Sequence, residues 1–111
     1  MPVDARQLDS GIVVVTISGR LAMGGDTERL DAAVKGLLLK DQKKFVLDIT
    51  SLDYVDSSGI GMLVSCVTHV RKAGGDLKLV GANPRIRRIF AMTGVESMMP
   101  MFNTLADATS A

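Results

Sequence analysis

The 111-residue sequence contains no tryptophan, a single cysteine and a single histidine, and only 4% of its residues are aromatic. One cysteine cannot form an intrachain disulfide, so nothing in the composition indicates an oxidising compartment. One histidine and one cysteine are also too few for a conventional zinc site. We therefore expect no metal and no cofactor, and a core built from Val, Leu, Ile and Met.

Long apolar runs and an excess of charge of one sign are missing as well. No stretch approaches the roughly 20 apolar residues that a membrane-spanning helix needs, and residues 1–10 lack the basic flank and apolar run of a signal peptide. Lys and Arg total 13 against 12 Asp and Glu, so the net charge is only +1. Such a balance gives no general attraction to nucleic acid or to an anionic membrane. We expect a cytoplasmic protein that binds neither.

The apolar content, in contrast, is typical of a folded protein. It reaches 47% of residues, which excludes intrinsic disorder. A chain of this length has room for one core and no second lobe, and no linker or internal repeat interrupts it. The sequence therefore predicts one domain over residues 1–111.

Several short apolar runs rich in β-branched residues predict strands. The predicted strands are 12–17, 45–49 and 77–80, with a first hairpin arm at 3–8 and a last short strand at 98–102. A turn at residues 9–11 precedes the strand at 12–17, and Gly19 is expected to end that strand. Residues 50–56 are expected to form a loop.

Apolar stripes of helical period separate these strands. Helices are predicted over residues 26–40 and 57–73, then from Pro84 until Gly94 closes the helix, with a last turn or two at 103–108. Asp26 or Thr27 is expected to cap the first helix and Asn83 the third. This alternation predicts an α/β fold: a mixed, mostly parallel sheet of four to five strands with about four helices packed on it.

The start of the second helix combines hydroxyl side chains with glycines. Its residues are Asp56, Ser57, Ser58, Gly59, Ile60 and Gly61. Ser57 or Ser58 is expected to be the N-cap. Glycines in a first turn lower helix stability, which is explained if another backbone or a partner's surface comes close. Free N–H groups and the positive end of the helix dipole would also accommodate a phosphate on a serine, and its charge would change what docks there.

The remaining reactive side chains have simpler explanations. Cys66 falls inside an apolar helical stripe and is expected to be a buried, inert thiol. His69 lies beside that stripe and is expected at the surface, without the nucleophile and orienting group that a catalytic base requires. Nothing in the sequence indicates an enzyme.

Two further clusters each leave two interpretations open. The arginines at positions 85, 87 and 88 form either the solvated face of a short helix or an anion site. The methionines at 92, 98, 99 and 101, with Phe102, form either core or a surface for self-association. The second interpretation would give a weak homodimer, and the first a monomer.

Nearly the whole chain resembles the STAS domain of anti-sigma factor antagonists. The D-S-S-G box at residues 56–59 follows the strand at 45–49, as in that family. Gly19-Arg20-Leu21 matches the G-x-L after the family's second strand, and Gly74–Leu77 matches the turn after its second helix. Residues 83–94 resemble its third-helix segment. The resemblance implies a single STAS domain with the fold predicted above.

The resemblance also implies a mechanism. In this family the serine directly after the aspartate is phosphorylated, which is Ser57 here. The unphosphorylated protein would bind an anti-sigma factor serine kinase and free a sigma factor. Phosphorylation would end the release, and a PP2C-type phosphatase would reset it. The implied partner surface consists of Asp56, Ser57, Ser58, Gly59, Ile60 and Gly61, together with Gly19 and Leu21.

One segment departs from the family pattern. Where the family often has G-E-L-D after its second strand, this chain has Arg20 and Ala22 in place of the two acidic residues. If those carboxylates contact the kinase, the partner surface here differs. Two alternatives therefore stay open: a phosphorylation-independent STAS adaptor subunit of a signalling assembly or lipid transporter complex, and a nucleotide-binding module that uses the arginine cluster.

Overall fold

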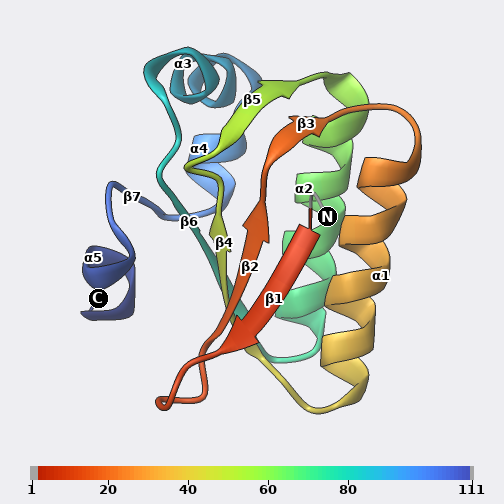
Figure 1. Ribbon diagram of the computed structural model, residues 1–111, viewed down its shortest axis with the longest axis vertical. Coiled ribbons are helices and arrows are strands. Elements are labelled where there is room, and N and C mark those ends of the chain that lie inside the picture. The colour runs from red at the N-terminus through yellow and green to blue at the C-terminus, as the bar shows by residue number, and fades with distance from the viewer. Residues whose placement is uncertain (1–2, 111) are drawn as a thin grey trace.

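The computed structural model describes residues 3–110, whose centre is a five-stranded mixed sheet (Figure 1). In spatial order its strands are β1 (Val3–Gln7), β2 (Val13–Ile17), β4 (Lys44–Asp48), β6 (Asp76–Val80) and β7 (Met101–Phe102). Strand β1 pairs antiparallel with β2, and every other neighbouring pair is parallel. The predicted α/β class and the mostly parallel sheet are confirmed.

A second, two-stranded sheet stands where the sequence predicted a loop. Strand β3 (Gly19–Leu21) pairs in parallel with β5 (Leu52–Val55), so the prediction of a loop over residues 50–56 is wrong. Strand β2 ends at Ile17, just before Gly19 as predicted, but Gly19 also begins β3. It adopts a positive φ of 75°, and its N–H donates to the Ser51 carbonyl at 2.9 Å, so the chain bends there and pairs with a new neighbour. A four-residue strand with both ends buried carries no alternation that sequence could reveal.

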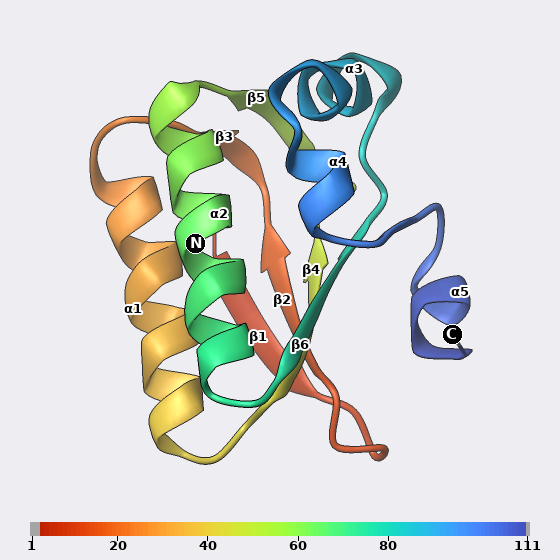
Figure 2. The ribbon, with the colours of Figure 1, turned by 180° about the vertical axis from the view of Figure 1, so that it is seen from behind.

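Within residues 3–110 five helices surround the sheets, one more than predicted. They are α1 (Gly25–Leu39), α2 (Ser57–Lys72), α3 (Pro84–Thr93), α4 (Val95–Met98) and α5 (Leu105–Ser110). Helices α1 and α2 lie side by side on one face of the sheet, while α5 covers part of the other (Figures 1 and 2). Of the strand predicted over 98–102, only Met101–Phe102 forms a strand, and Met98 is instead the last residue of helix α4. None of the helices described is long and apolar enough to cross a membrane.

The two faces of the sheet bury different clusters. Side chains such as Leu47 and Leu79 pack against α2, where Cys66 is buried as predicted. That burial raises the pKa of the Cys66 thiol to about 12, so the group stays protonated and unreactive. On the other face Val46 and Val80 pack against α5. Of the methionine cluster, only Met99 is fully buried.

Helix caps follow the sequence in one case and not in another. The side chain of Asn83 accepts a hydrogen bond from the Ile86 N–H at 2.8 Å, as predicted for α3. Helix α1 instead begins after Gly24, with no side-chain cap, and the Thr27 hydroxyl donates to the Gly24 carbonyl at 3.2 Å. Thr27 is therefore not the N-cap. The side chain of Asp26, the other expected cap, lies outside the described part of the chain.

Candidate functional site

Asp56 anchors the start of helix α2 to the end of strand β3. Its carboxylate accepts hydrogen bonds from two backbone N–H groups, that of Gly59 at 2.9 Å and that of Met23 at 3.1 Å. Its own N–H donates to the Leu21 carbonyl at 3.3 Å. Asp56 is thus the N-cap of α2, and the prediction that Ser57 or Ser58 caps this helix is wrong. An aspartate has two acceptor oxygens and uses one for each segment, whereas a serine side chain has a single oxygen.

These bonds favour the ionised form of Asp56. The Gly59 and Met23 amides hold the pKa of this carboxyl below its ordinary value of 3.8, and the charge of Arg20 acts in the same direction. Because the folded-state pKa is lowered, the stabilising contribution is present above the unfolded value and is lost as the pH falls through the folded one. The helix start is therefore held most firmly at neutral pH.

Asp56→Asn tests this anchor. Asparagine still accepts from the Gly59 N–H, but its amide nitrogen cannot accept from Met23, so we expect a lower melting temperature at pH 7. The difference from the wild type should shrink as the pH falls below 3.8, because the wild-type carboxylate becomes protonated there. Thermal unfolding followed by circular dichroism between pH 7 and pH 3 measures both effects. A difference that is constant with pH would contradict the anchor.

The two serines of this segment differ in exposure. Ser57 is exposed at the first position of α2, whereas Ser58 and Ile60 are half-buried. The helix amides are not as free as the sequence suggested, because the Gly59 N–H is already bonded to Asp56. One of the amides expected to receive a phosphate on Ser57 is therefore already in use. Such a phosphate would extend from an exposed side chain beside a carboxylate.

The two glycines of the first turn serve different purposes. A Cβ on Gly59 would lie 2.1 Å from the Leu21 carbonyl oxygen and 2.7 Å from Cγ2 of Val55, so the predicted close approach of another backbone is confirmed here. A Cβ on Gly61 would meet nothing within 4 Å, and this residue is exposed. The interior of the protein therefore explains Gly59 but leaves Gly61 unexplained.

The G-x-L segment, residues 19–21, forms strand β3 and supports the start of α2 from the interior. Leu21 is completely buried, so its side chain supports the surface and cannot itself contact a partner. Gly19, half-buried, bends the chain into β3. Ala22 is also buried, so an acidic side chain at this position would need to move outward to reach solvent. In Figure 1, β3, β5 and the start of α2 gather at one end of the molecule.

Three exposed neighbours complete this surface, and of these the sequence singled out only Arg20. The guanidinium of Arg20 stacks over the ring of Tyr54 at 4.6 Å from its centroid, joining β3 to β5. Met23 is 81% exposed, although its N–H is bonded to Asp56. The sequence signal for Met23 was an apolar side chain followed directly by two glycines, in Ala22-Met23-Gly24-Gly25. We call the exposed residues Arg20, Met23, Tyr54, Ser57 and Gly61 the Ser57 surface.

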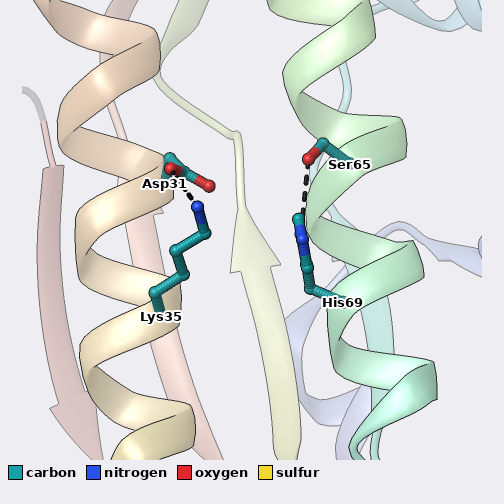
Figure 3. A network of polar contacts seen from close by, with 4 residues as sticks. All are labelled: Asp31, Lys35, Ser65 and His69. Atoms are coloured by element: carbon teal, nitrogen blue, oxygen red, sulfur yellow. Dashed lines mark hydrogen bonds and ion pairs between the residues drawn. The ribbon is translucent and has the colours of Figure 1, made fainter.

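The other candidate residues lie away from this surface or pair locally. His69 is exposed as predicted, and its Nδ1 lies 3.3 Å from the Ser65 hydroxyl on the same helix. Figure 3 shows this pair facing Asp31 and Lys35, which form a 3.0 Å ion pair within α1. Each contact joins residues one turn apart, as is usual for solvated helix faces.

The arginine cluster also belongs to a solvated helix face. All three of its side chains are exposed on α3, and Arg87 donates to the Asn103 side chain at 3.0 Å. This observation favours the simpler of the two interpretations. The nucleotide-binding alternative has no further support from these residues.

Comparison with known proteins decides the family. The profile of the STAS domain matches residues 5–108. The chain belongs to the STAS domain family. Its similarity to the anti-sigma F factor antagonist of Paenibacillus polymyxa is 27% identity, over 88% of this chain and 84% of that protein.

Solved structures of STAS proteins share the architecture described above. An anti-sigma factor antagonist from Mycobacterium paratuberculosis superposes with a TM-score of 0.85 at 25% identity, covering 97% of this chain and 90% of that one. The anti-sigma factor antagonist SpoIIAA in its unphosphorylated form gives a TM-score of 0.75 at 17% identity, covering 96% and 93%. The Bacillus protein has also been solved in its phosphorylated form.

Proposed function

We propose that this STAS domain is an anti-sigma factor antagonist controlled by phosphorylation of Ser57. The unphosphorylated protein binds an anti-sigma factor that is itself a serine kinase, and the bound kinase releases its sigma factor. Support comes from relatives that are named anti-sigma factor antagonists and that align with most of this chain. A phosphorylated form of SpoIIAA, which shares this fold, is further support.

The observation that carries the proposal is the arrangement around Ser57. Its hydroxyl is exposed, whereas the residues on either side are held in place: Asp56 by two backbone amides, and Gly59 against the Leu21 carbonyl. A kinase can therefore reach the hydroxyl without unfolding the helix. A charge added to such a fixed, exposed point changes docking and leaves the fold intact.

The switch itself is a phosphoryl transfer from ATP held by the kinase. The Ser57 oxygen attacks the γ-phosphorus, a new Oγ–P bond forms, and the bond to the β,γ-bridging oxygen breaks, so that ADP leaves. The hydroxyl proton passes to a base of the kinase. A PP2C-type phosphatase hydrolyses the phosphoserine and restores the hydroxyl. No residue of this chain needs to act as a catalyst in either step.

Release of the sigma factor tests the proposal. The chain is added to preformed complexes of each anti-sigma factor kinase of the source organism with its sigma factor, and size-exclusion chromatography follows the sigma factor. One of these complexes is expected to release its sigma factor. Release by none of them, with the chain purifying instead as a fixed subunit of a larger assembly, would favour the phosphorylation-independent adaptor.

A further inference from the structure

Arg20 lies on β3, which pairs with the strand that leads into the proposed phosphorylation site. Its guanidinium stacks on Tyr54, 4.6 Å from the ring centroid, and the two residues are register partners between β3 and β5. Stacking occupies the flat faces of a guanidinium and leaves its five N–H groups free in the plane. Within residues 3–110 these N–H groups donate no hydrogen bond. Arg20 is thus an exposed, oriented cation whose donors are unused.

The strand pairing brings Arg20 close to the start of α2. Leu21, the next residue, is the register partner of Val55 and accepts a hydrogen bond from the Asp56 N–H. The charge of Arg20 also contributes to the lowered pKa of Asp56. Arg20 directly precedes Leu21 and Ser57 directly follows Asp56, so both residues adjoin this contact between β3 and the start of α2.

The helix amides offer a phosphate on Ser57 less than the sequence suggests. The Gly59 N–H is bonded to the Asp56 carboxylate, and that carboxylate would repel an additional anion. A phosphoserine carries about 1.5 to 2 negative charges and three strong acceptor oxygens at pH 7. Planar N–H pairs of arginine fit such oxygens better than any other side chain.

We propose that Arg20, presented by its stack on Tyr54, is the counter-ion of phosphorylated Ser57. This inference rests on the proposed function for the identity of the modified residue. Phosphorylation then has two effects: it adds a bulky anion to the Ser57 surface, and it pairs the Arg20 guanidinium with that anion. A partner that contacted Arg20 in the unphosphorylated protein would lose that contact as well.

The ionisation of the phosphate tests the pairing directly. Phosphoserine is installed at position 57 of the full chain during translation, and its second pKa, ordinarily about 6, is measured by phosphorus-31 NMR titration. Arg20 stabilises the dianion, so Arg20→Gln is expected to raise this pKa by about 0.5 of a pH unit. Arg20→Lys, which keeps the charge but loses the planar fork, should fall between the two.

Lys72→Gln is the matched control. It removes one positive charge at the last residue of α2, about 22 Å along the helix from Ser57. This distance is well beyond the screening length of about 8 Å at physiological salt. The phosphate pKa should be the same in this variant as in the wild type. Equal values in wild type and Arg20→Gln would overturn the pairing. Because no kinase is used, that result leaves the proposed function standing, whereas failure of sigma release would count against the proposed function alone.

Discussion

Ser57→Asp is expected to weaken binding to the anti-sigma factor kinase by at least about tenfold. The substitution adds a permanent negative charge at the exposed first position of α2. Binding of the kinase at this position would remove water from around that charge. Placing such a charge against a partner that accommodates a neutral hydroxyl costs more than about 1.4 kcal/mol, which is the free energy of a tenfold change. Isothermal titration calorimetry with the purified kinase measures the change.

Two companion variants give this result its meaning. Ser57→Ala keeps the surface neutral and should bind like the wild type while escaping phosphorylation. Ser58→Asp places the same charge one residue along, on a half-buried side chain, and should weaken binding less. Equal affinity of the wild type and Ser57→Asp would count against the switch. Equal loss in both aspartate variants would indicate a general charge effect.

Gly59→Ala is expected to destabilise the protein more than any other single change at this site. The new Cβ would lie 2.1 Å from the Leu21 carbonyl oxygen, which is backbone and cannot swing away. Over-packing of this kind costs typically about 1–3 kcal/mol, equivalent to a fall in melting temperature of roughly 4 °C or more. The shift would also disturb the Asp56 N–H bond to Leu21.

Gly61→Ala is the matched control on the same helix turn. Nothing lies within 4 Å of its Cβ position, so alanine should leave stability unchanged or raise it by up to about 1 kcal/mol through better helix propensity. Thermal unfolding of both variants compares them. If a partner's surface approaches Gly61, this variant should bind more weakly although it is no less stable. Similar destabilisation by both substitutions would contradict the packing described for Gly59.

Sequence reasoning located this site but misassigned some of its parts. The apolar runs at 45–49 and 77–80 predicted β4 and β6 because buried parallel strands are almost continuously apolar. Strand β5 was missed because four residues are too few to establish a period. The N-cap was given to a serine because propensity ranks Ser and Asp alike. The second donor to the Asp56 carboxylate, the Met23 N–H, lies 33 residues away in the chain, and only the folded structure brings the two residues together.

The composition of the Ser57 surface had a similar limit. Arg20 was recognised as a departure from an acidic family pattern, but its stack on Tyr54 depends on a strand pairing that the sequence did not reveal. The predicted close approach of another backbone is confirmed for Gly59 and not for Gly61. Only the positions of Leu21 and Val55 show that this explanation holds for Gly59 and that Gly61 needs another.

Phosphosite mapping tests the central claim most directly. The wild type, Ser57→Ala and Ser58→Ala are each incubated with ATP and the anti-sigma factor kinase whose sigma factor the chain releases, and intact-mass and peptide mass spectrometry locate the phosphate. We predict one phosphate per chain on Ser57 in the wild type and Ser58→Ala, and none in Ser57→Ala. Phosphate on another residue, or none while the kinase modifies a known substrate, would contradict a switch at Ser57 and make this residue part of a constitutive docking surface.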